Sequence, residues 1–189
     1  MKYLRLFKSF EKDIDKICKK YRIKNYTINQ DGSIDVDGNV WLYEKKLTEL
    51  PLKFNKVNWY FDCSRNYLTT LEGSPKEING DFYCRNNELT SFEFAPKIIR
   101  GYFYCQNNNI KSFEYFPSFV KDDFGCDYNP IYEVWELFED TTKIELLNDF
   151  DIFRDEDTDE PAIIMDRLND FLLTIGKEPV KKVDRYKNI

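Results

Sequence analysis

Five cysteines and no histidine set the chemistry open to this 189-residue chain. Without an imidazole there is no histidine general base, no histidine metal ligand and no Ser-His-Asp or Cys-His hydrolytic device. Thiolates leave two functions open, because four of them form a common structural zinc site and neighbouring thiols can oxidise to disulfides. The cysteines that recur at intervals of 21 residues are Cys63, Cys84, Cys105 and Cys126. Whether these cysteines can form a zinc site or disulfides depends on the secondary structure in which they lie.

Other residue types recur with the same period of 21 residues. A Phe stands two positions before each of these Cys residues, an Asn stands three positions after it, and an aliphatic residue stands four positions before each Phe. These residues are Phe61, Phe82, Phe103 and Phe124; Asn66, Asn87, Asn108 and Asn129; and Val57, Ile78, Ile99 and Val120. A degenerate earlier copy has Val40 and Leu42 in the Phe and Cys positions. A fixed period of this kind predicts a solenoid, in which each unit buries its apolar face only against its neighbours.

The run from Leu68 to Cys84 reads Leu-Thr-Thr-Leu-Glu-Gly-Ser-Pro-Lys-Glu-Ile-Asn-Gly-Asp-Phe-Tyr-Cys. It resembles the short-period leucine-rich-repeat unit that is common in large bacteriophages and other viruses. The resemblance covers residues 36 to 138. It implies an α/β solenoid of about five coils with a parallel β-sheet. It also implies protein binding as the default role, in a virus-encoded protein that binds or inhibits a host factor.

Stacking decides what the cysteines can do. Phe and Cys, two residues apart, point to the same face of a strand, and stacked strands lie about 4.8 Å apart. Four thiols in such a row form a line, which cannot surround a tetrahedral zinc ion. We therefore predict reduced thiols packed in the core, without metal or cofactor, and keep a disulfide between adjacent thiols as the alternative. Cys18 lies on an apolar helix stripe and receives the same interpretation.

Two further positions of the frame have structural roles. The Asn lies where the chain leaves the strand, where its amide can satisfy backbone groups that an irregular turn leaves unpaired. Gly80 and Gly101 stand two residues before a Phe, and we expect either a positive φ or a close approach of two backbones there.

Strand residues that alternate with Phe and Cys point away from the core. Many of them are Tyr or Trp, which with Arg dominate the energetics of protein interfaces. The predicted partner-binding residues are Trp41, Tyr43, Tyr60, Asp62, Tyr83, Arg85, Tyr102, Tyr104 and Gln106. The alternative is that aromatic residues simply favour strands and stack on one another across the sheet.

Carboxylates on the same positions raise the question of an enzyme. Asp62, Asp81, Asp123 and Asp127 project from the predicted strands, and two well-placed carboxylates suffice for acid–base chemistry. No nucleophile elbow, ligand loop or phosphate-binding glycine segment accompanies them, so we predict a protein that is not an enzyme. The segment 31–38 has the composition of a calcium loop without its spacing, and we predict no metal there.

The flanking segments predict caps for the repeats. We divide the chain into an N-terminal helix and hairpin cap at 1–36, a solenoid at 37–138, and a C-terminal helical cap with a loose basic tail at 139–189. The first helix covers residues 7–21, with Phe7, Phe10, Ile14, Ile17, Cys18 and Tyr21 on its apolar stripe. Strands 26–28 and 34–36 form the hairpin. Later helices are expected at 131–138, from Thr141 or Thr142 to Phe150, and from Pro161 to Gly176.

Charge and hydropathy limit the partners. The net charge of −6 argues against nucleic-acid binding, and the longest apolar runs are too short to span a bilayer. Met1 to Phe10 lacks the apolar core of a secretory signal, so we expect a cytoplasmic location, in host cytoplasm if the protein is viral. The acidic run 155–160 is interpreted as a solvated loop, with mimicry of a nucleic acid as an alternative. Self-association through the acidic C-terminal helices is a further alternative, although we favour a monomer.

Overall fold

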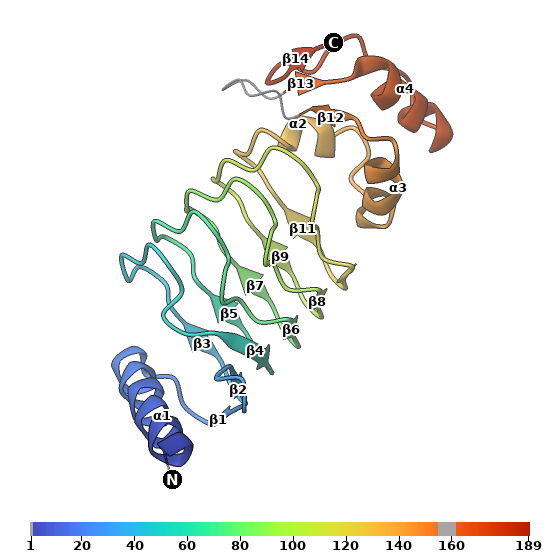
Figure 1. Ribbon diagram of the computed structural model, residues 1–189. Helices are drawn as coiled ribbons and strands as arrows, with labels where there is room; N and C mark the ends of the chain where they lie inside the picture. Colours follow the sequence, from blue (N-terminus) through green and yellow to red (C-terminus); the bar gives the residue numbers. More distant parts are fainter. Residues whose placement is uncertain (1, 155–161) are drawn as a thin grey trace.

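The computed structural model describes residues 2–154 and 162–189, and the side chains of residues 11–154 and 162–189. Stacked parallel strands in a solenoid-like α/β repeat form most of it, with helices at both ends (Figure 1). Successive strands of the sheet that contains the Phe and Cys positions follow at intervals of 21 residues. They are β3 (Val40–Trp41), β5 (Phe61–Asp62), β7 (Phe82–Tyr83), β9 (Phe103–Tyr104) and β11 (Phe124–Gly125). All four pairings are parallel, and Phe82 lies opposite Phe61 and Phe103.

A second sheet runs beside the first, whereas the sequence predicted one. Its strands, in spatial order, are β1 (Tyr26–Ile28), β2 (Ile34–Val36), β4 (Phe54–Val57), β6 (Glu77–Ile78), β8 (Ile98–Ile99) and β10 (Phe119–Val120). It arises because the aliphatic position of the frame also ends a short strand in each unit. The β1–β2 pair is antiparallel and forms the predicted hairpin, and the remaining pairings are parallel.

Between the two sheets lies a core built from repeated side chains. Phe61, Phe82 and Phe103 have no exposed surface, and neither do the four cysteines of the frame. The rings of Phe82 and Phe103 stack with centroids 5.3 Å apart and planes 17° apart. Because consecutive rings contact each other, the core is continuous along the stack and not divided between units.

Buried asparagines join each unit to the one before it. The Asn87 side-chain oxygen accepts a hydrogen bond from Leu68 N at 3.1 Å, and its amide nitrogen donates to the carbonyl oxygens of Cys63 and Cys84, each at 3.1 Å. Asn66, Asn108 and Asn129 repeat this pattern one unit apart. The predicted role of the asparagine is confirmed, with the addition that its contacts cross between units.

Local backbone geometry places these asparagines. The residue before each has a left-handed conformation, with φ of 54° at Arg65, 55° at Asn86, 56° at Asn107 and 60° at Tyr128. This turn directs the following Asn inward. Gly80 and Gly101 do not have positive φ; a Cβ on Gly80 would lie 2.7 Å from Trp59 O. Of the two expected reasons for these glycines, close approach of neighbouring backbones is therefore correct.

The N-terminal end of the core is covered by α1 (Lys2–Tyr21) and the hairpin (Figure 1). Ile14 and Cys18 on the helix are buried, and Ile17 and Tyr21 are half-buried. Phe7 and Phe10, predicted for the same apolar stripe, lie outside the described side chains. The helix begins earlier than predicted and ends at the expected residue.

The C-terminal cap extends the aromatic core. It contains α2 (Tyr132–Trp135), a 3-10 turn (Thr141–Lys143), α3 (Ile144–Asp149) and α4 (Met165–Thr174). Trp135 packs edge-on to Phe124, with ring centroids 4.9 Å apart, and Phe138 reaches Phe171 at 5.5 Å. The Asp140 side chain, rather than a threonine, accepts the capping hydrogen bond, from Thr142 N. The helix predicted to begin at Pro161 begins at Met165 instead, and Pro161 lies outside the described residues.

The tail is packed, not loose as predicted. Lys187–Asn188 forms β14, which pairs with β13 (Ala162–Ile163), and β13 pairs with β12 (Phe153–Arg154). Val183 and Tyr186 are buried, and the Tyr186 hydroxyl donates to Lys111 O at 2.9 Å. These anchors are single residues without helical or strand periodicity, so sequence pattern alone does not reveal them.

Replacing Asn87 by Ala should destabilise the protein by roughly 2–4 kcal/mol, because buried backbone groups of two units lose their partners. Asn109→Ala serves as the matched control, since Asn109 is exposed, and it should change stability by less than about 0.5 kcal/mol. Urea unfolding followed by circular dichroism measures both. Equal stability of the two variants would show that the asparagines do not hold the units together.

Candidate protein-binding face

The predicted partner-binding residues lie on and beside β3, β5, β7 and β9, on the side away from the Phe and Cys core. We call the following nine the strand face: Trp41, Tyr43, Tyr60, Asp62, Tyr83, Arg85, Tyr102, Tyr104 and Gln106. Trp41 is 50% exposed, Tyr102 42% and Tyr60 37%. Tyr43 and Arg85 are also exposed, whereas Tyr83, Tyr104 and Gln106 are half-buried. Eight of the nine therefore reach the surface.

Contacts among these rings hold them in place. Tyr102 and Tyr104 stack with centroids 5.5 Å apart and planes 10° apart, and Tyr83 lies 5.8 Å from Tyr104. The Arg85 guanidinium lies over both Tyr83 and Tyr104, at 5.2 and 5.8 Å from the ring centroids. Trp41 and Tyr60 form a second pair at 6.3 Å. Such contacts reduce the side-chain entropy that a binding partner has to remove.

Asp81 anchors the centre of the strand face. Its carboxylate accepts hydrogen bonds from the Tyr83 hydroxyl at 2.7 Å and from Tyr102 N at 2.9 Å. Burial raises the pKa of the Tyr83 hydroxyl, and the hydrogen bond to the Asp81 carboxylate raises it further. Burial also raises the pKa of Tyr104, with Asp123 contributing. Both hydroxyls therefore stay protonated at neutral pH and can donate hydrogen bonds.

Asp62 does not belong to the exposed surface, although it was predicted to bind a partner. It is only 9% exposed, and its carboxylate accepts from Ser64 N at 2.9 Å. The parallel register places it between Trp41 and Tyr83. A short side chain between two large ones is screened from solvent, and alternation along one strand cannot reveal this effect of its neighbours.

The C-terminal end of the strand face is hollow. A depression of about 460 Å³ is lined by Tyr104, Gln106, Asp123, Asp127 and Tyr132, among others. Gly125 stands there, where β7 and β9 carry Tyr, and the side chains of Tyr104 and Gln106 occupy the space above it: a Cβ on Gly125 would lie 2.8 Å from Cδ1 of Tyr104 and against the Gln106 amide. The Gln106 Oε1 atom is buried and has no hydrogen-bond partner. A donor from outside reaches this acceptor only if the side chains that cover it move.

The four aspartates predicted to project from the strands differ in their surroundings. Asp62 and Asp81 accept hydrogen bonds from their own surroundings. Asp123 is exposed and Asp127 is partly exposed, so water reaches both.

All five cysteines are free thiols and all are buried. Burial raises the pKa values of Cys63, Cys84, Cys105 and Cys126 far above the ordinary value, and that of Cys18 to about 11. Among the described side chains, those of residues 11–154 and 162–189, no three Cys, Asp or Glu gather as a metal site requires.

Sequence reasoning missed several exposed aromatic residues outside the strand face. Those at least 44% exposed are Trp59, Tyr67, Phe94, Tyr115, Phe119 and Tyr128. Phe94 and Tyr115 occupy the position of Gly73 in the preceding unit, and all three have positive φ. The signal was available in the repeat alignment, because a large aromatic residue at a position that suits glycine is unusual.

A comparison with models of protein families finds no match to this chain, and comparisons with curated proteins and with solved structures find none either. Within the described ranges, no helix has both the length and the apolar character needed to cross a bilayer.

The buried thiols predict a loss of stability at alkaline pH. Folding raises each thiol pKa above its unfolded value of about 8.5, so the contribution to stability is complete below that pH. Above it, the unfolding free energy should fall by about 1.4 kcal/mol per pH unit for each thiol. Urea unfolding at pH 7.5, 8.5 and 9.5 measures the slope. The double variant Cys84→Ala/Cys105→Ala should have a visibly smaller slope; an unchanged slope would mean that other groups cause the pH dependence.

Proposed function

We propose that this protein is a non-enzymatic interaction module, a leucine-rich-repeat solenoid of five coils that binds another protein through its strand face. The observation that carries the proposal is the set of exposed aromatic side chains Trp41, Tyr60 and Tyr102 on one face of the sheet, together with the exposed Arg85, which lies over Tyr83 and Tyr104. A solvent-facing sheet does not need such residues for stability, whereas aromatic residues and Arg are the commonest anchors of protein interfaces.

The size of the strand face fits this role. Five parallel strands at the usual spacing give a surface about 20 Å across. A surface of that width supplies at most one ordinary half-interface of about 800 Å². Gln106 lines the depression at the end of the strand face, and its unpaired Oε1 gains a hydrogen bond if a partner displaces the side chains that cover it and donates there.

The kind of partner follows from the resemblance to viral repeat proteins. We propose a host factor that is bound or inhibited, and a location in the host cytoplasm. Five buried free thiols support a reducing compartment, since disulfides persist chiefly in oxidising ones.

Self-association is the second candidate. Leu173 on α4 is 59% exposed, which leaves an apolar side chain available on the C-terminal cap. The acidic run 155–160, which would support mimicry of a nucleic acid, lies outside the described residues. Measurement of the solution mass separates the two candidates, because a monomer excludes self-association as the main role.

The triple variant Tyr83→Ala/Tyr102→Ala/Tyr104→Ala should lose partner binding by at least tenfold while keeping its circular dichroism spectrum, since these rings lie on the surface of the sheet. The matched control replaces three exposed aromatic residues elsewhere, Tyr67, Tyr115 and Phe119, by Ala. Affinity capture from host lysate identifies the partner, and titration calorimetry then measures the dissociation constant for each variant. Equal binding by both triple variants rejects the strand face.

A further inference from the structure

A groove of about 820 Å³ opens on a part of the surface that the strand face does not include. Its lining comes from three successive connections between the two sheets, those from β3 to β4, β5 to β6 and β7 to β8. The lining residues fall within 48–54, 69–76 and 94–97. None of them belongs to the strand face, so the groove is a separate feature of the repeat array.

An irregularity of the repeat creates the groove. The same position of three successive units holds Leu52, Gly73 and Phe94, so a residue without a side chain lies between two large ones. Gly73 cannot be replaced easily, because its φ is +90° and a Cβ would lie 2.8 Å from Leu52 O. The next position holds Ser74 and then Ala95, which are also small. Small residues, namely Gly73, Ser74 and Ala95, therefore line the groove beside the large side chain of Phe94.

The floor contains a polar atom without a partner. Ser74 is only 8% exposed, and its hydroxyl makes no hydrogen bond in the structure. Leaving a buried hydroxyl unpaired costs free energy, because the group has lost its hydrogen bonds to water without replacing them. The next unit has the apolar Ala95 at this position, so the fold itself does not require a hydroxyl. A ligand oxygen that accepts from Ser74 would remove the cost.

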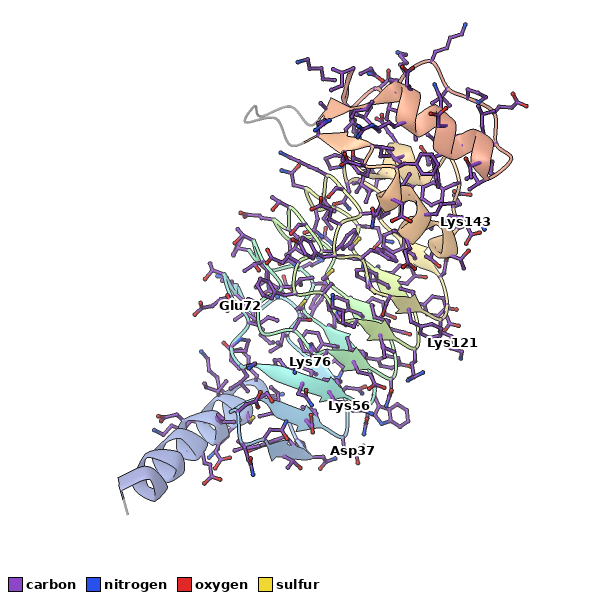
Figure 2. The ribbon with its side chains drawn as sticks, turned by 45° about the vertical axis from the view of Figure 1, so that its right-hand side comes forward. Asp37, Lys56, Glu72, Lys76, Lys121 and Lys143 are labelled. Carbon is purple, nitrogen blue, oxygen red and sulfur yellow. The ribbon has the colours of Figure 1, made fainter. Side chains whose placement is uncertain are left out.

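The rim of the groove carries both basic and acidic side chains. Lys53, Lys76 and Lys97 line the groove on the side that follows Gly73 along the chain, while Glu49 and Glu72 line it on the preceding side. Figure 2 shows Glu72 and Lys76 apart from each other, with Lys76 near the second sheet. Lys53 forms an ion pair with Asp31 at 3.3 Å, but both side chains are more than half exposed, so the pair is weak. The lysine side of the groove can therefore receive an anion.

Beside Ser74, the groove is lined by the apolar ring of Phe94. Phe94 is 51% exposed and has a φ of 62°, which is rare for a bulky residue. Tyr115 has the same conformation one unit later, outside the groove, so the conformation belongs to the repeat and the exposed ring is what the groove uses. The exposed ring offers an apolar contact a short distance from the Ser74 hydroxyl and the lysines.

We propose that this groove binds an extended acidic segment of a second protein, in which an aromatic side chain stands next to a carboxylate. The aromatic side chain packs against Leu52 and Phe94, and the carboxylate accepts hydrogen bonds from Ser74 and from Lys76 or Lys97. A peptide fits better than a small molecule, because small ligands need a cavity that buries most of their surface. This groove instead lies open across three units, a span of about 10 Å.

The test titrates the ¹⁵N-labelled full-length protein with the peptide acetyl-Asp-Phe-Asp-amide and follows its amide resonances. Shifts should be confined to residues 48–54, 69–76 and 94–97. Since the protein carries a net charge of −6, general electrostatic attraction cannot produce binding of an anionic peptide. The peptides acetyl-Asn-Phe-Asn-amide and acetyl-Asp-Ala-Asp-amide should each bind at least fivefold more weakly.

Substitutions test which side chains of the groove contact the peptide. Ser74→Ala should weaken the acidic peptide at least fivefold without loss of thermal stability, because the hydroxyl has no partner within the chain. Lys76→Gln/Lys97→Gln should weaken it at least tenfold. Lys121→Gln/Lys177→Gln makes the same change of charge at exposed sites outside the groove and should stay within twofold of wild type.

Three results would overturn the proposal: no shifts at millimolar peptide, equal loss in both double-lysine variants, or binding of 3-phenylpropionate as tight as that of the peptide. The last result would assign the groove to small carboxylates. None of these outcomes bears on the strand face, whose residues lie outside the groove.

Discussion

Each repeat unit that carries the frame asparagine is tied to the unit before it by that side chain, which is buried in three units and partly buried at Asn108. The amide serves as donor and acceptor at once, and it bonds to two successive units where the chain turns out of the strand. Hydrophobic contact alone would allow neighbouring units to slide, because apolar surfaces have little directional preference. The asparagines fix the register, and the register stacks the Phe rings and aligns the outward-facing residues into one surface.

The same period explains why much of the fold could be predicted from the sequence. Residues that recur every 21 positions have to occupy equivalent places, so the Phe and Cys core, the Asn contacts and the outward direction of Tyr83 and Tyr104 all follow from counting. The second sheet was missed because each unit contributes only one residue of the frame to it, the aliphatic one, whereas Phe and Cys, two positions apart, mark the first sheet by their alternation.

Features that depend on non-equivalent neighbours were harder to predict. Asp62 has the sequence position of an exposed residue, yet the large residues on either side in adjacent strands bury it. The tail holds its place through Tyr186, whose hydroxyl bonds to a carbonyl 75 residues earlier in the chain. The groove at Gly73 and Ser74 likewise results from differences between units. Departures from the repeat, not the repeat itself, thus produce the individual surfaces of the protein.

The stacking of nearly identical units also bears on how such a chain evolves. In-frame duplication of one 21-residue unit would add a strand to each sheet and an asparagine to the ladder without disturbing either cap. The buried residues of the new unit would already match those of its neighbours in size and shape, while its outward-facing residues would be free to diverge. A gene of this kind can therefore lengthen its binding surface in steps of about 4.8 Å and then change the chemistry of each new row separately.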